Sequence, residues 1–191
     1  MSEGAELLGA VRAVVTALER HEVRYFITGS FASSVQGEFR ATNDLDVVAG
    51  LAPAQLEPLF HDFAHDFVVD IDQARSALGS SSSFNLIHRV TYLKVDVFPC
   101  LTPFDREATR RAESIAISPE ISSLRVATRE DILLAKIRWY SLGGEISETQ
   151  RRDIQRLVAL NEGEFDESYL RHWAARLNVS GLLKHFLSAG G

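Results

Sequence analysis

The chain has 191 residues, of which 46% are hydrophobic and 24% are charged, and its formal net charge is −6. These values are ordinary for a globular protein with a core of its own, and they exclude a chain that binds nucleic acid over its whole surface. The single cysteine, Cys100, rules out an intrachain disulfide and fits a reducing cytoplasm, the expected location. The N-terminal segment lacks the features of a signal peptide, and no apolar run approaches the ~18 residues that span a membrane, so no membrane partner is expected.

The first two thirds of the chain are predicted to alternate between helices and strands. Apolar residues recur at helical spacing from residue 5 to residue 20 and predict an amphipathic helix there. Short β-branched and aromatic runs predict strands at 24–28, 44–49, 67–71, 84–89 and 93–98, and further extended segments at 112–117 and 124–127. Helical segments are expected at 30–37, at 53–64 and in a turn that ends at residue 78.

From residue 128 onward the chain is predicted to be helical. Capping-box patterns begin at Thr128 and at Ser147, and Gly143-Gly144 separates the two helices that they start. Two further helices are expected at 167–177 and 181–187. Four aromatic residues are expected to pack between these helices rather than to stack on bases: Trp139, Tyr140, Trp173 and Phe186.

The most informative pattern joins a Gly-Ser pair to three aspartates. Gly29 and Ser30 end one predicted strand, and thirteen residues separate Ser30 from Asp44. Asp44 and Asp46 project to one face because side chains alternate along a strand, and Asp96 lies inside another apolar strand. Three carboxylates are hard oxygen ligands suited to Mg²⁺, so the pattern predicts a site for two-metal phosphoryl or nucleotidyl transfer.

The Gly-Ser pair at a strand-to-helix junction is suited to binding a phosphate group. The N-terminus of a helix leaves backbone N–H groups free and carries partial positive charge. Gly29 would let a phosphate approach the backbone, and Ser30 would add a hydroxyl. Serine is also a common helix cap, so the pair by itself is a weak signal, and its distance from Asp44 makes it a strong one.

The segment ITGSFASSVQGEFRATNDLDVV resembles the signature of the polymerase-beta-like nucleotidyltransferase superfamily. Residues 40–46 look like the variant found in small bacterial nucleotidyltransferases, including the AbiEii-like toxins. The resemblance covers 19–98 well and the helical remainder loosely. It implies an α+β nucleotidyltransferase fold, with a core of a small mixed sheet and helices packed on one side at 1–127. A helical C-terminal subdomain at 128–191 would close a cleft.

The resemblance also implies a reaction and a set of roles. The reaction is transfer of a nucleoside monophosphate from a nucleoside triphosphate (NTP) to a hydroxyl, with release of pyrophosphate. Asp44 and Asp46 would bind two Mg²⁺ ions, while Asp96 would bind the catalytic ion and act as base for the hydroxyl. Gly29 and Ser30 would bind the β- and γ-phosphates.

Lys136 lies on an apolar helix face, where a lysine needs a partner unless its ammonium reaches solvent. In AbiEii-like proteins a Lys on a following helix and an Asp on the next belong to the active-site motifs, and Lys136 and Asp153 resemble these two. Lys136 would neutralise triphosphate charge and Asp153 would orient it. The nucleotide-binding set implied by the resemblance also includes Arg40 and Thr42.

Two other patterns compete for the metal site. Asp70-Ile71-Asp72 also has the Asp-apolar-Asp form, but no Gly-Ser pair precedes it at the right distance, and a strand end with a helix cap is the preferred interpretation. His61 and His65 have metal-ligand spacing on a helix, but the sequence lacks the Glu of the HExxH arrangement. A polar helix face is therefore preferred for the two histidines.

The acceptor and the partners stay open. For a toxin, the resemblance implies RNA, in particular the tRNA 3′ end, and a cognate antitoxin protein. Small relatives also modify antibiotic hydroxyls or proteins. An inactive relative that serves as a binding or regulatory module is the alternative from another class. Three arginine-rich stretches, around 106–111, 125–138 and 151–156, are interpreted either as solvated helix faces or as a phosphate-tracking groove.

Overall fold

The structure is a computed structural model that describes residues 3–35, 43–80, 82–119, 121 and 123–188. Its first compact unit contains the described residues of 3–31 and 43–127, and its second contains 32–35 and 128–188. Each unit is described by itself. The division into a core at 1–127 and a helical subdomain at 128–191 stays a prediction.

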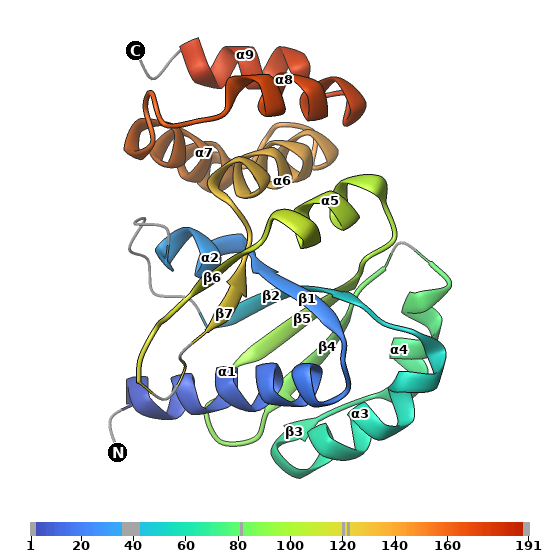
Figure 1. The fold of residues 1–191 in the computed structure, drawn as a ribbon. Helices are drawn as coiled ribbons and strands as arrows, with labels where there is room; N and C mark the ends of the chain where they lie inside the picture. Colours follow the sequence, from blue (N-terminus) through green and yellow to red (C-terminus); the bar gives the residue numbers. More distant parts are fainter. Residues whose placement is uncertain (1–2, 36–42, 81, 120, 122, 189–191) are drawn as a thin grey trace. The chain divides into compact units, whose positions relative to one another are not determined.

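The first unit is built on a seven-stranded mixed sheet with the order β3-β4-β5-β2-β1-β7-β6 (Figure 1). The strands are β1 (Arg24–Thr28), β2 (Asp44–Gly50), β3 (Phe67–Val68), β4 (Phe84–His88), β5 (Lys94–Pro99), β6 (Glu113–Ile115) and β7 (Leu124–Val126). The β2–β5 and β1–β7 pairs are parallel, and the other pairs are antiparallel. The α+β class predicted from the sequence is confirmed.

One face of this sheet is apolar and buried. The register places Ile27 opposite Val47, Val47 opposite Val97 and Leu45 opposite Val95, so the odd-numbered residues of the central strands share this face. All five are buried. Burying a side chain of this size stabilises the fold by roughly 1.5–3 kcal/mol, so this face fixes the register of the central strands.

Helix α1 (Glu3–Arg20) packs beside β1 and against α3 (Pro53–Asp66). The hydroxyl of Tyr25, on the apolar face, donates to the carboxylate of Glu19 at 3.1 Å, which places α1 on that side of the sheet. The other helices of the first unit are α4 (Ile71–Leu78), α5 (Pro103–Arg111) and the first turn of α2 (Gly29–Val35). With α1 and α3 on the apolar face, the opposite face is left for polar side chains.

The second unit packs four helices against one another: α6 (Arg129–Leu142), α7 (Glu148–Leu160), α8 (Glu167–Arg176) and α9 (Ser180–Ser188). Thr128 and Ser147 cap α6 and α7 as predicted, because their hydroxyls accept from the backbone N–H groups of Asp131 and Gln150. Asp131 is buried, and the hydroxyl of Tyr169 donates to it at 2.5 Å. None of the described helices is both long and apolar enough to span a membrane.

The fold contains one helix that was not predicted, a strand β3 that is shorter than the predicted 67–71, and one aromatic residue that departs from its expected packing. Helix α5 was not predicted, because it buries only Phe104 and Ala108. It is defined instead by a capping box in which Thr102 accepts from Asp105 N–H at 3.1 Å and Asp105 accepts from Thr102 N–H at 2.8 Å. The expectation that four aromatic residues pack between helices is wrong for Trp139, which is 53% exposed. It is confirmed for the other three, which are buried: Tyr140, Trp173 and Phe186.

Candidate active site

The polar face of the sheet carries a row of side chains from four neighbouring strands. In this row Thr28 of β1 lies opposite Asp46 of β2, Asp46 lies opposite Asp96 of β5, and Asp96 lies opposite Asn85 of β4. Neighbouring strands lie about 4.7–4.9 Å apart, so residues in register on one face are close neighbours. The sheet therefore brings Asp46 and Asp96 together, although fifty positions separate them in the sequence.

A second row lies beside the first. Asp44 of β2 lies opposite Lys94 of β5, and Lys94 lies opposite Ile87 of β4. Since Asp44 is two residues from Asp46, and Lys94 is two residues from Asp96, both rows share one face. Asp44, Asp46 and Asp96 are thus on the same side of adjacent strands.

Lys94 supplies the positive charge on this face. Its Nζ lies 2.8 Å from Oδ2 of Asp96, and the side chains are 45% and 18% exposed. The hydrogen bond and charge of Asp96, with the charges of Asp44 and Asp46, raise the pKa of Lys94, and partial desolvation opposes this. Lys94 is therefore positively charged at neutral pH, among three carboxylates.

Gly29 meets this face from the end of β1. Its φ is +68°, in the left-handed region that favours glycine, and a Cβ at this position would stand 1.9 Å from Oδ2 of Asp46. The carboxylate of Asp46 therefore lies against the backbone at the first residue of α2, beside Ser30. The chain folds so that the Gly-Ser pair and the Asp-x-Asp pair meet.

The donor set fits a divalent cation. Carboxylate oxygens are the ligands that Mg²⁺ prefers, and the ammonium group of Lys94 stands in for a cation beside Asp96. The three carboxylates contribute three negative charges and Lys94 one positive charge, so a net charge of −2 faces any ion that binds here. Within the described residues, no group of three or more His, Cys, Asp or Glu side chains is drawn together closely enough to hold a metal ion as it stands.

Lys136 and Asp153 lie in the second unit, on α6 and α7. Nζ of Lys136 is 3.5 Å from Oδ2 of Asp153, and the side chains are only 14% and 12% exposed. Lys136 therefore has a partner on this apolar face, as predicted, and its side chain does not extend into solvent. The assignment of both residues to nucleotide binding stays a prediction.

The competing pairs have structural explanations. Asp70 is the N-cap of α4, and its Oδ1 accepts from the backbone N–H groups of Asp72 at 3.0 Å and Gln73 at 3.1 Å. His65 hydrogen-bonds the neighbouring Asp66 at 2.6 Å. Arg40 and Thr42, which the resemblance assigns to the nucleotide, lie outside the residues that the structure describes.

Three polar residues of the candidate site were not predicted from the sequence: Thr28, Asn85 and Lys94. Lys94 lies at strand period 2 from Asp96 and so shares its face, which was the available signal. Thr28 and Asn85 have no such signal, because their place depends on which strands pair.

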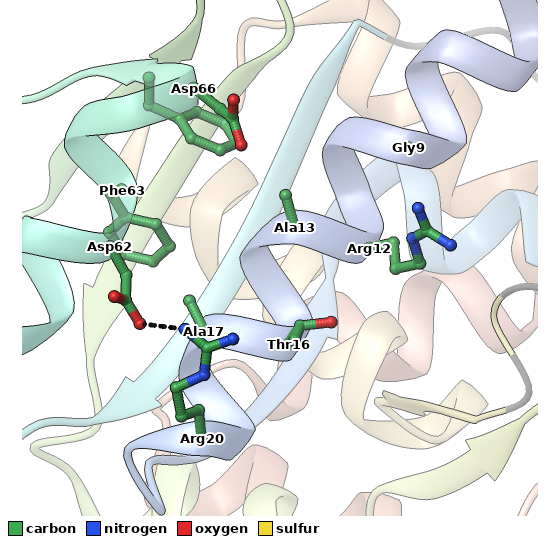
Figure 2. Close-up of a pocket in the computed structure, with 10 residues that line it drawn as sticks. Gly9, Arg12, Ala13, Thr16, Ala17, Arg20, Asp62, Phe63 and Asp66 are labelled. Atoms are coloured by element: carbon green, nitrogen blue, oxygen red, sulfur yellow. Dashed lines mark hydrogen bonds and ion pairs between the residues drawn. The ribbon is translucent and has the colours of Figure 1, made fainter.

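A separate pocket of about 550 Å³ lies between α1 and α3 (Figure 2). Two arginines, Arg12 and Arg20, and two aspartates, Asp62 and Asp66, line it together with Gly9, Ala13, Thr16, Ala17, Phe63 and Phe67. Nη1 of Arg20 lies 2.9 Å from Oδ2 of Asp62, and Nε2 of His21 lies 3.0 Å from the same oxygen. None of the site residues predicted from the sequence lines this pocket, so it is distinct from the carboxylate face.

No protein-family model matches the chain, and no curated protein matches it either. The fold is similar to solved structures. A solution structure of the antibiotic-resistance factor ANT(2″)-Ia has a TM-score of 0.60 and 15% identity, over 96% of this chain and 98% of that one. A crystal structure of ANT(2″)-Ia in complex with adenylyl-2″-tobramycin has a TM-score of 0.58 and 12% identity, over 91% and 97%.

A third similar structure is that of an antigenic nucleotidyltransferase-like protein from Paracoccidioides brasiliensis. Its TM-score is 0.53 and its identity 20%, over 97% of this chain and 93% of that one. At identities this low the structural likeness shows the fold alone, and the AbiEii-like subgroup stays a prediction. The mixed sheet, its helices and the likeness over nearly the full length of each chain identify this protein as one with the nucleotidyltransferase fold.

Proposed function

We propose that this protein is a metal-dependent nucleotidyltransferase that moves a nucleoside monophosphate from an NTP, in particular ATP, to a hydroxyl acceptor. The observation that carries the proposal is the register of Asp46 with Asp96 on adjacent strands, with Asp44 on the same face and Gly29 against Asp46. An arrangement of three carboxylates beside a glycine at a helix start suits the binding of a cation with a triphosphate.

The position of each candidate residue suggests its role in binding the cation or the phosphates. Asp44, Asp46 and Asp96 would hold the two Mg²⁺ ions, which when bound offset phosphate charge and activate the acceptor oxygen. Gly29 and Ser30 would hold the β- and γ-phosphates at the N-terminus of α2.

The chemical step is a substitution at the α-phosphorus. The acceptor oxygen forms a bond to the α-phosphorus, the bond from that phosphorus to the bridging oxygen of the β-phosphate breaks, and pyrophosphate leaves. The hydroxyl proton passes to the carboxylate of Asp96, which lies at the edge of the carboxylate row farthest from Gly29. Asp96 is the base in this scheme because the sequence resemblance implies that role for it, and its register beside Asp46 supports the assignment.

A small hydroxylated molecule is the acceptor that we favour. The protein is similar over nearly its whole length to ANT(2″)-Ia, whose complex contains an adenylylated tobramycin. In two of the arginine-rich stretches, charge is offset within the helix: Arg110 pairs with Glu107 at 2.6 Å, and Arg151 pairs with Glu148 at 2.7 Å. Such pairs weaken the case for a phosphate-tracking groove, so tRNA as acceptor and a cognate antitoxin are the second candidate, resting on the sequence resemblance.

The test is the response of the melting temperature to Mg²⁺ with ATP. Any ligand that binds the native state raises the melting temperature, so the parent should be stabilised. Asp44→Asn with Asp46→Asn should abolish the shift, while the matched pair Asp70→Asn with Asp72→Asn should keep it, because asparagine can still cap α4. A parent that shows no shift would sink the proposal, and loss of the shift in the control pair alone would move the site to Asp70 and Asp72.

Transfer itself separates the enzyme from a binding module. Purified parent, Mg²⁺ and ATP labelled at the α-phosphate should label aminoglycosides or other polyhydroxylated small molecules in a panel assay. Label in an RNA fraction instead would favour the tRNA candidate. A parent that binds Mg²⁺ with ATP and labels neither class would support the regulatory alternative.

A further inference from the structure

Lys94 holds a position that the proposed reaction does not use. Its backbone N–H donates to the carbonyl of Asn43 at 3.0 Å, which fixes the start of β5 to the residue before β2. Its side chain runs along the polar face, where it lies opposite Asp44 and reaches Asp96 at 2.8 Å. One ammonium thus lies among the carboxylates that would bind the cation.

The charge balance requires such a group. Three carboxylates on one sheet face repel one another, because like charges that share a partly desolvated surface are screened less than in bulk water. Lys94 offsets part of this repulsion and holds the carboxylate of Asp96 in a defined place. A divalent cation that binds the same carboxylates has to compete with that contact.

We propose that Lys94 is an internal counterion that holds Asp96 before the cation binds and competes with the cation for that carboxylate. The inference rests on the proposed function, because it assumes a cation site at Asp44, Asp46 and Asp96. The lysine can leave without disturbing the sheet: its backbone is fixed by β-sheet pairing, and its flexible side chain is 45% exposed. Cation binding then replaces a single positive charge by a double one and reduces the net negative charge of the face.

The test measures cation affinity directly, without nucleotide and without turnover. Mn²⁺ is titrated calorimetrically into the parent and into three variants: Lys94→Met, Lys94→Arg and Lys184→Met. Lys184 is exposed on α9, outside the strands that carry the carboxylates, so Lys184→Met is the control that lowers the net charge of the chain by the same amount. Lys94→Met removes both the contact with Asp96 that the cation has to displace and a positive charge that repels the cation, so this variant should bind Mn²⁺ about tenfold more tightly.

Thermal unfolding supplies the second readout. In EDTA, Lys94→Met should melt roughly 2–4 °C below the parent, since the carboxylates have lost their counterion. At saturating Mn²⁺ this difference should vanish or reverse, because the cation replaces the lysine. Lys94→Arg, which keeps the charge, should stay near the parent in both measurements, and so should Lys184→Met.

The outcomes distinguish failure of the counterion role of Lys94 from failure of the proposed cation site. Unchanged Mn²⁺ affinity in Lys94→Met, beside a parent that binds Mn²⁺, would overturn the counterion role and leave the cation site intact. Equal tightening in Lys184→Met would also overturn it, because net charge alone would then explain the effect. If neither the parent nor any variant binds Mn²⁺ or Mg²⁺ with ATP, the proposed function itself fails.

Discussion

Gly29 and Asp46 are in direct contact, because the carboxylate of Asp46 occupies the space where a side chain at position 29 would stand. The contact joins the two halves of the sequence pattern. Two separate features require glycine at position 29: its positive φ and the close approach of a carboxylate. Glycine is required here whether or not a phosphate binds.

Gly29→Ala should therefore be more damaging than an alanine at another glycine with positive φ. Gly163 is the matched control, because its φ is +75° and a Cβ added there would meet nothing within 4 Å. Each substitution should cost about 1 kcal/mol of unfolding free energy for the left-handed backbone. Gly29→Ala should lose a further ~1–3 kcal/mol from the clash with Asp46, and cation binding should weaken. Equal urea-unfolding curves for the two variants would contradict the close approach.

Asp96→Asn separates the chemical step from nucleotide binding. Transfer of labelled nucleotide should fall by orders of magnitude, because the neutral amide cannot accept the proton of the hydroxyl. Affinity for Mg²⁺ with ATP should fall much less, since Asp44 and Asp46 remain. Asn85 lies directly opposite Asp96 on β4, so Asn85→Ala shows how far transfer falls when a neighbouring side chain is changed and the carboxylate is kept. Full transfer by Asp96→Asn would show that this carboxylate is not the base.

Lys136 and Asp153 can be tested for a role beyond packing. Breaking a buried ion pair leaves an unpaired charge, so Lys136→Met alone should destabilise the protein by about 3 kcal/mol. The double change Lys136→Met with Asp153→Leu should recover most of that loss. If the pair serves the nucleotide, ATP affinity should stay low in the double variant although urea unfolding is restored. Normal ATP affinity there would leave the pair with a structural role only.

The link between α1 and α3 should be sensitive to acid. Hydrogen bonds from His21 and Arg20 hold the pKa of Asp62 below its ordinary value of 3.8. A lowered carboxyl pKa means that the unfolded state binds the proton first, so the stabilisation is present above 3.8 and is lost as the pH falls through the folded pKa. Asp62→Asn should remove this part of the acid sensitivity in urea unfolding measured from about pH 6 down to about pH 2. An unchanged pH profile would show that the contact contributes nothing.

The sequence by itself determined most local elements and the part of the candidate site that lies on β2 and at the start of α2. The period of two in β2 placed Asp44 and Asp46 on one face, and the end of an apolar run placed Gly29 at a strand-to-helix junction, because these properties depend only on neighbouring residues. The same local rules missed α5, whose capping box was readable at Thr102 and Asp105 but whose few apolar residues gave no helical period.

Tertiary structure decided which strands pair and in which register. Only the parallel β2–β5 pairing brings Asp96 opposite Asp46 and Lys94 opposite Asp44, and a slip of one residue would turn both to the buried face. The burial of Val47, Val95 and Val97 on the apolar face selects this register, because a slip would expose all three. The positions of the carboxylates and of Lys94 relative to one another are therefore fixed by the burial of the hydrophobic residues that alternate with them. Spacing along the chain does not show which strands pair.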